Sequence, residues 1–191
     1  MEKRKKLNVK AYVSIGMLSS IAYLLMLIQF PLPMFPNFLF VDFSDIPAVI
    51  AGLVFGPLAG ILVELFKNIL NYIATGSQTG VPVGHIANFV AGIVFVLPTL
   101  FVYNRLKTRK GMTIALVAGT VIMAVVMSIL NYIVILPAYT LLMGFPDMRN
   151  LVVPAILPFN ILKGIMMSII FMLLFIRMQA WINKFSVIKR A

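Results

Sequence analysis

Apolar stretches long enough to cross a bilayer recur along this sequence, and they limit the folds that it can adopt. The first runs from Ala11 to Phe30 without a charged side chain. The hydrocarbon core of a bilayer takes about 20 residues of α-helix. Charged residues make up only 11% of the chain, whereas a soluble domain carries about 25%. We therefore expect an all-α integral membrane protein.

Basic residues precede the first apolar stretch, as they do in a secretory signal peptide. A cleavable apolar region spans about 7–15 residues and ends at a site of small residues. Here the stretch is longer, and it runs into Pro31 with no such site. We interpret it as an uncleaved first transmembrane helix.

Hydropathy and the breaks made by proline and glycine predict six transmembrane helices in a single domain, residues 1–191. The second helix begins at Asp45-Ile46-Pro47 and is short for a full span, so it is expected to be tilted or half-buried within protein. The six helices are expected at about residues 11–30, 45–55, 58–74, 83–103, 112–142 and 151–181.

The basic residues indicate the orientation. They gather in the N-terminal tail 1–10, in the loop 104–110 and at the C-terminus. Short loops rich in lysine and arginine stay in the cytoplasm, and six helices put all three groups on that side. The segment 31–44 then lies outside. Its prolines exclude a helix, yet it is rich in phenylalanine, so we expect an outer lid loop that packs down onto the protein.

Several polar side chains fall inside the predicted helices, where a charge costs about 2.5–3.5 kcal/mol. By the topology they converge on the outer half of the membrane, where amides and an ammonium group would suit a neutral, flat, hydrogen-bonding ligand. Some of them could instead join helices by hydrogen bonds, and Glu64 with Lys67 could be a structural i, i+3 ion pair. The polar residues are Glu64, Lys67, Asn68, Asn71, Asn88, Asn131, Asn160 and Lys163.

Other classes of function are disfavoured by what the sequence lacks. It has no cysteine and one histidine, so we expect no metal site and no cysteine nucleophile. The phosphate-binding motif G-x-x-x-x-G-K-[ST] and the hydrolase motif G-x-S-x-G do not occur. Its basic clusters flank apolar spans, so we expect no nucleic-acid partner. One histidine and five carboxylates leave little for acid–base catalysis, so we expect no catalytic residues.

Three stretches resemble the riboflavin-specific substrate-binding (S) component of energy-coupling factor (ECF) vitamin transporters. They are ELFKNILNYIATGSQTGVPVGHIANFVAG (64–92), LNYIVILPAY (130–139) and PFNILKG (158–164). The resemblance implies six helices, capture of riboflavin from outside the cell, and uptake driven by a transmembrane coupling subunit and two cytoplasmic ATPases. Riboflavin would be cargo, and no cofactor is implied.

The resemblance also assigns residues. It implies that polar groups on the last two helices meet the flavin, and that the lid loop covers the bound vitamin. Glu64 fits the family pattern, with a less direct role. The substrate-binding residues expected on this basis are Asn131, Asn160, Lys163, Glu64, Asn88, Leu39, Phe40, Val41 and Asp42.

The family packs its first helix on the coupling subunit through small residues. The corresponding stretch here is Gly16-Met17-Leu18-Ser19-Ser20, so Gly16 and Ser20 would permit close helix approach, or would pack inside the protein itself. Two other functions stay open. One is capture of a different vitamin on the same scaffold, and the other is a self-sufficient ion-coupled carrier that uses Glu64 and Lys67.

Overall fold

The computed structural model describes residues 9–77 and 80–185, and most of this part of the chain is helical. Two long helical rods each contain a π-helical turn, so each of these two rods carries more than one helix label. The helices are α1 (Val9–Leu27), α2 (Asp45–Phe55), α3 (Pro57–Thr75), α4 (Val83–Leu106), α5 (Arg109–Leu130) with η1 (Asn131–Ile135) and α6 (Leu136–Met143), and η2 (Arg149–Leu151) with η3 (Val152–Ile156) and α7 (Leu157–Phe185).

Five helical rods in the described residues are long and apolar enough to cross a membrane: α1, α3, α4, the rod Arg109–Met143 and the rod Arg149–Ile182. The sixth apolar helix, α2, has only 11 residues, of which nine are buried. Neighbouring helices surround it, so a short helix can lie at membrane depth without exposing its ends to lipid. The six predicted helices are confirmed.

The first helix ends at Leu27 rather than near Phe30. Phe30–Pro31 (β1) instead pairs antiparallel with Phe40–Val41 (β2), and the two short strands form the ends of a loop. Pro31 has no N–H to continue the helix. The helix therefore ends before the apolar stretch does.

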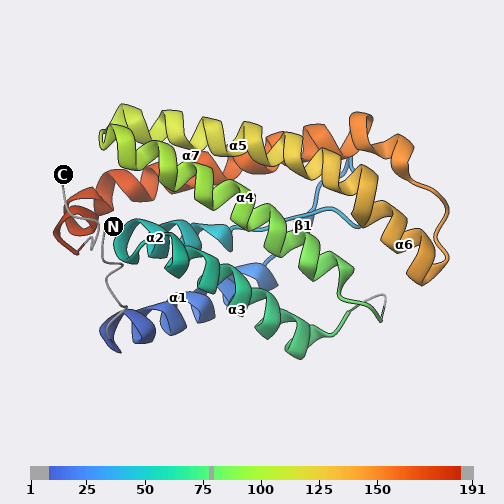
Figure 1. Ribbon diagram of the computed structural model, residues 1–191, viewed down its shortest axis with the longest axis horizontal. Coiled ribbons are helices and arrows are strands. Elements are labelled where there is room, and N and C mark those ends of the chain that lie inside the picture. Colours follow the sequence, from blue (N-terminus) through green and yellow to red (C-terminus); the bar gives the residue numbers. More distant parts are fainter. Residues whose placement is uncertain (1–8, 78–79, 186–191) are drawn as a thin grey trace, which may run out of the picture.

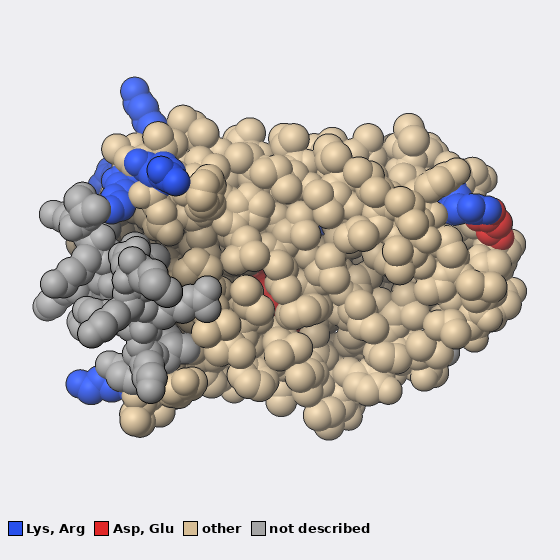
Figure 2. All heavy atoms as spheres, viewed as in Figure 1, with Lys and Arg blue, Asp and Glu red and all other residues tan. Residues whose placement is uncertain are grey.

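The rods lie roughly along one long axis (Figure 1). The start of α1, the α4–α5 connection and the end of α7 all lie at one end, drawn on the left. Figure 2 shows most of the visible lysine and arginine at that end, an almost uncharged belt along the middle, and one small charged group at the other end. An exposed apolar belt between charged ends suits a protein that crosses a bilayer.

Small residues allow the helices to approach closely. A Cβ atom added at Gly119 would lie 2.2 Å from Thr99 Oγ1, where α5 crosses α4. One added at Gly164 would lie 2.5 Å from Thr120 Cγ2, where α7 crosses α5. Packing of this kind is typical of membrane helices, which gain little from hydrophobic burial against one another.

The two π-helical turns, η1 and η3, lie close to prolines. Pro137 follows η1, and Pro154 lies within η3. Proline removes a backbone donor, and local π adjustments are one way in which membrane helices satisfy the freed groups. The rods therefore continue through these prolines, and Asn131 begins the first π turn.

Some predictions fall on residues that the structure does not describe. These are positions 1–8 of the basic N-terminal tail, positions 78–79 of the loop before α4, and the basic residues after position 185.

Candidate ligand-binding pocket

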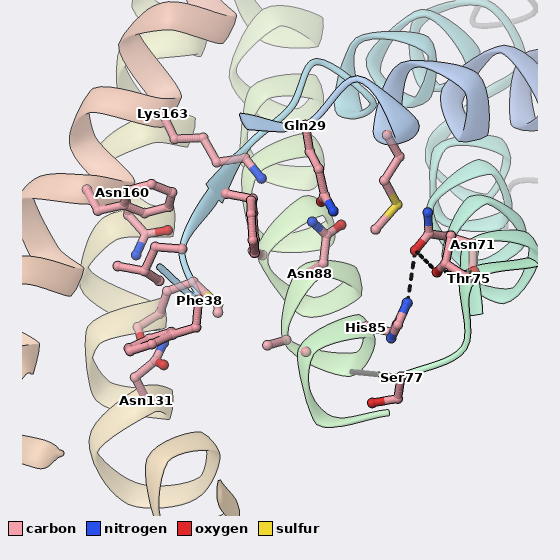
Figure 3. A pocket seen from close by; sticks show the side chains of 18 of the residues that line it. Gln29, Phe38, Asn71, Thr75, Ser77, His85, Asn88, Asn131, Asn160 and Lys163 are labelled. Atoms are coloured by element: carbon pink, nitrogen blue, oxygen red, sulfur yellow. Dashed lines mark hydrogen bonds between the residues drawn. The ribbon is translucent and has the colours of Figure 1, made fainter. Parts of the chain in front are cut away.

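A cavity of about 410 Å³ lies between the loop that joins α1 to α2 and the ends of α3, α4, α5 and α7. Pockets for small molecules usually measure about 300–1,000 Å³ and combine apolar walls with a few polar groups. Figure 3 shows the polar side chains reaching the cavity from opposite sides. Its lining is Met26, Leu27, Gln29, Phe38, Leu39, Phe40, Asn71, Thr75, Gly76, Ser77, Gly84, His85, Ala87, Asn88, Ala91, Met127, Asn131, Tyr139, Phe159, Asn160 and Lys163.

Two amides on neighbouring rods face this cavity from one side. Asn131 Nδ2 donates to the Met127 carbonyl at 2.7 Å, and Asn160 Nδ2 donates to the Ile156 carbonyl at 2.8 Å. Each bond fixes a side chain on its own helix but uses only one N–H. The amide oxygens accept no hydrogen bond within the described residues, so each amide can still both donate to and accept from a ligand.

Lys163 reaches the same region from α7. Its Nζ lies 3.2 Å from Asp42 Oδ2, and Asn88 Nδ2 lies 3.5 Å from the same oxygen. Asp42 also accepts from the Ser44 N–H at 2.9 Å and from the Ser44 hydroxyl. Burial alone would raise the pKa of the Asp42 carboxyl. The charges of Lys163 and Lys67 and the hydrogen bonds from Ser44 outweigh this effect, so the pKa lies below its usual range.

The lid segment packs down onto the protein as the sequence predicted. The Phe35 ring meets the Phe159 ring edge to face, with centroids 5.5 Å apart, and the Phe38 ring lies 6.4 Å from the Tyr139 ring. Leu39 and Phe40 line the cavity from the same segment. Aromatic side chains from the loop, α6 and α7 therefore surround the two amides and could contact a flat ring.

A second polar group, which we call the ion cluster, is buried beside the cavity and consists of Asp45, Glu64 and Lys67. Lys67 Nζ lies 2.8 Å from Glu64 Oε2, contacts Asp45 Oδ1, and donates to the Ser44 hydroxyl at 2.8 Å. Lys67 and Glu64 are both 0% exposed. Within the described residues, Glu64 Oε1 and Asp45 Oδ2 have no hydrogen-bond partner. The i, i+3 ion pair that sequence analysis gave as an alternative for Glu64 and Lys67 is therefore present on α3.

A glycine on α4 makes space for this cluster. A Cβ atom added at Gly92 would lie 2.1 Å from Glu64 Oε2 and 2.4 Å from its Cδ. Even an alanine at this position would therefore collide with the carboxyl group, since real Cβ contacts are not this short.

The structure brings most of the predicted site residues to one cavity. Six of them line it: Asn131, Asn160, Lys163, Asn88, Leu39 and Phe40. Three do not. Val41 is fully buried in β2, Asp42 contacts Lys163 instead, and Glu64 belongs to the ion cluster.

Sequence reasoning did not assign several lining residues to the site. Gln29, Phe38, Tyr139 and Phe159 carry no signal beyond hydrophobicity or a position in a loop. Asn71 and His85 had a signal, because Asn71 is one of the polar residues within a predicted helix and His85 is the only histidine in the sequence. That signal does not show which residues of other helices lie next to Asn71 and His85 in the folded protein.

The residues expected to contact a partner lie elsewhere. Gly16 and Ser20 are exposed on α1, and the Ser20 hydroxyl donates to the Gly16 carbonyl at 3.1 Å. A Cβ atom added at Gly16 would meet no atom within 4 Å. This face of α1 is therefore not packed inside the protein. The described residues contain no group of three or more His, Cys, Asp or Glu side chains that could hold a metal ion.

Comparison with known proteins assigns the chain to a family. The family model described as "ECF transporter, substrate-specific component" matches residues 10–175. The chain belongs to this family. Its relatives are named as transporters and not as enzymes, which agrees with the prediction that the protein is not an enzyme. The chain is a multi-pass membrane protein.

Curated relatives match over nearly their whole length. A protein named riboflavin transporter FmnP from Bacillus subtilis is 50% identical over 183 residues, covering 93% of this chain and 96% of the relative. A protein named riboflavin transporter RibU from Staphylococcus aureus is 42% identical over 191 residues, covering 96% and 100%.

Solved structures confirm the fold. One described as the S component of a bacterial ECF transporter is 42% identical, with a TM-score of 0.79 over 91% of this chain and 98% of the other. A truncated transition metal transporter shares the fold at 18% identity, with a TM-score of 0.63 over 93% and 84%. The similarity to the second structure concerns the fold alone.

Proposed function

We propose that this protein captures riboflavin at the outer face of the cell membrane as the substrate-binding subunit of an ECF importer. The observation that carries the proposal is the pair of incompletely bonded amides, Asn131 and Asn160, beside the Lys163 ammonium under an aromatic loop. A flavin ring carries carbonyl acceptors and an N–H donor on one edge and apolar faces elsewhere. Both curated relatives are named as riboflavin transporters.

In this proposal the ring edge meets the two amides and the ammonium group. Lys163 and the amide N–H groups donate to ring carbonyls, and an amide oxygen accepts from the ring N–H. Phe38, Tyr139 and Phe159 contact the ring. The lid residues Leu39 and Phe40 cover it, and Asn88 lies beside Lys163. Val41, Asp42 and Glu64 act from behind the lining, through loop packing and charge.

The basic end of the molecule faces the cytoplasm in this proposal, and the cavity opens to the outside. The N-terminal tail and the C-terminus would then be cytoplasmic, with residues 31–44 as the outer lid. The charge distribution in Figure 2 supports this orientation.

The test is to purify the protein and record its absorption and fluorescence spectra before and during titration with riboflavin. We expect a yellow preparation or, after ligand removal, binding at submicromolar concentration. A colourless protein that carries another vitamin and does not respond to riboflavin would overturn the proposal.

We further propose that the chain works with a transmembrane coupling subunit and two cytoplasmic ATPases. The exposed Gly16–Ser20 face of α1 supports this proposal, because small residues let another helix approach closely. Gly16→Leu should keep riboflavin binding and abolish co-purification with the assembly. Ile21→Phe is the control, since it adds bulk at another exposed position of α1. Normal co-purification of Gly16→Leu would refute this docking site.

A further inference from the structure

The charged side chains in the interior do not balance. Within residues 9–77 and 80–185, three buried side chains are acidic and two are basic, and each is at most 4% exposed. Every other lysine or arginine whose side chain the structure describes is exposed. If all five buried groups were ionised, the interior would carry one surplus negative charge. The five are Asp42, Asp45, Glu64, Lys67 and Lys163.

The contacts among these groups show where the surplus lies. Lys163 balances the carboxylate of Asp42, since its Nζ lies 3.2 Å from Asp42 Oδ2. Lys67 instead serves two carboxyl groups, because its Nζ contacts Asp45 Oδ1 and lies 2.8 Å from Glu64 Oε2. The surplus charge therefore lies in the ion cluster.

Glu64 is the least satisfied of the three carboxyl groups. Asp42 accepts hydrogen bonds from Ser44, and Asp45 accepts one from Lys67. Neither oxygen of Glu64 accepts a hydrogen bond from the described residues, because the contact with Lys67 is close but not aligned as a hydrogen bond. Burying a carboxylate without donors is costly, and such a group takes up a proton instead.

The position of Glu64 in the fold also favours the neutral acid. Asp45 lies in the first turn of α2, where the helix dipole stabilises a negative charge, whereas Glu64 lies in the interior of α3. Asn68, one turn after Glu64, presents a buried Oδ1 that accepts no hydrogen bond from the part of the chain that is described. A protonated carboxyl group has an O–H donor to offer, and a carboxylate has none.

The titratable groups around Glu64 come from its own helix, from α2 and from the end of the lid loop. Lys67 and Asp45 are its direct neighbours, and the Asp42–Lys163 pair is joined to Lys67 through a serine hydroxyl. α4 meets Glu64 with a glycine, which brings no charge. α1 also packs on α3, but its one charged residue, Lys10, is exposed. A proton is the remaining way to neutralise the cluster from the groups described.

We propose that the ion cluster is a proton-binding site, which holds one proton on Glu64, shared with Asp45, at neutral pH. The interior is then electrically neutral, because Lys163 balances Asp42 and Lys67 balances Asp45. Carboxyl groups this close titrate as a pair, so the proton belongs to the cluster. A water molecule would satisfy an acceptor but would leave the surplus charge. This inference does not depend on which ligand the cavity takes.

The site makes stability depend on pH in a definite direction. A glutamate in the unfolded chain loses its proton near pH 4.3, or about there. The folded protein keeps that proton, so it binds one proton more than the unfolded chain above this pH. Rising pH then lowers stability by about ten-fold in the unfolding equilibrium constant per pH unit, until the folded cluster also releases its proton.

The first test compares the melting of wild type and Glu64→Gln in detergent across a range of pH. Glutamine is close in size to the protonated acid, neutral, and able to donate. Glu64→Gln should therefore melt close to wild type at mildly acidic pH and above it as the pH rises. Asp147→Asn, which changes an exposed carboxylate, should follow wild type throughout. If Glu64→Gln melts well below wild type at every pH, or does not fold, Glu64 is ionised and the proposal is overturned.

Infrared spectra give a second test that needs only folded wild-type protein. A protonated carboxyl group absorbs apart from carboxylates, and we expect such a band near neutral pH. The band should persist in Asp147→Asn and vanish in Glu64→Gln. It should also vanish in Asp45→Asn, where Lys67 balances Glu64 alone. Absence of the band from wild type overturns the proposal. So does a wild-type melting temperature that rises with sodium or potassium chloride but not with choline chloride, because a metal cation would then occupy the cluster.

Discussion

The ion cluster and the cavity are both polar regions inside an apolar helical protein, but they differ in how completely their polar groups are paired. In the ion cluster, Lys67 contacts two carboxylates and a hydroxyl group, and Lys67 and Glu64 are fully shielded from solvent. In the cavity, Asn131 and Asn160 each spend one N–H on their own helix and leave the rest of the amide facing a hollow. We therefore expect the ion cluster to stabilise the fold and the incompletely bonded amides to contact the ligand.

The largest effect should follow from removing the cation of the ion cluster. Lys67→Met leaves Asp45 and Glu64 buried without their partner, which costs about 3–5 kcal/mol. We expect little folded protein in detergent, judged by size-exclusion chromatography and thermal melting. Lys67→Met combined with Glu64→Gln should melt at a higher temperature than Lys67→Met alone. A normal melting temperature for Lys67→Met would break the distinction between the two regions.

Lys163 shares a feature with each region, since it lines the cavity and also forms a buried ion pair, with Asp42. Lys163→Met should weaken riboflavin binding by about 10–100-fold, because it removes a charged donor. The protein should still fold, since Asp42 keeps its bonds from Ser44. Repeating the titration in an Asp42→Asn background separates loss of the ligand contact from an unpaired carboxylate. Unchanged affinity would make Lys163 structural.

The amides should show a smaller and more selective effect. Asn131→Leu and Asn160→Leu should each weaken riboflavin binding about ten-fold with little change in melting temperature. Asn68→Leu is matched to them, because Asn68 makes the same bond to its own helix but lies outside the lining. It should leave affinity unchanged. Equal losses from all three variants would remove the difference between lining and buried amides.

The smallest effect should come from the exposed ion pair in which Arg149 Nη2 lies 2.6 Å from Asp147 Oδ2. Hydrogen bonds from Arg149 lower the pKa of the Asp147 carboxyl, but both groups are open to solvent. Exposed pairs contribute little to stability, so Asp147→Asn should change neither melting temperature nor affinity measurably. A clear loss of either would show that exposed and buried pairs matter alike in this protein.

The helices could be predicted because a bilayer imposes a length and an apolar composition on each span. The Glu64–Lys67 pair could be predicted as well, because three residues along a helix bring two side chains together. The Lys163–Asp42 pair could not, since 121 positions separate its members and a single sequence does not show which loop meets which helix. The π turns were also missed, because hydropathy carries no information on hydrogen-bond register.

The cavity lining was predicted only in part for the same reason. Depth along a helix placed Asn131, Asn160 and Lys163 at one level, which was enough to group them. It did not show that the first turn of α4 faces α3, so the contact between His85 and Asn71 was not predicted. Glu64 was assigned to the site by the family resemblance, although its side chain belongs to the ion cluster.

The missing side chain at Gly92 constrains how this protein can change over generations. Glu64 can keep its present side-chain position only while residue 92 has no Cβ, and an alanine there would require the carboxyl group to shift or a shorter residue at position 64. Either change would disturb the contact between Lys67 and Glu64. Descendants should therefore alter these positions jointly or keep them both, a covariation that a sufficiently deep collection of related sequences would reveal.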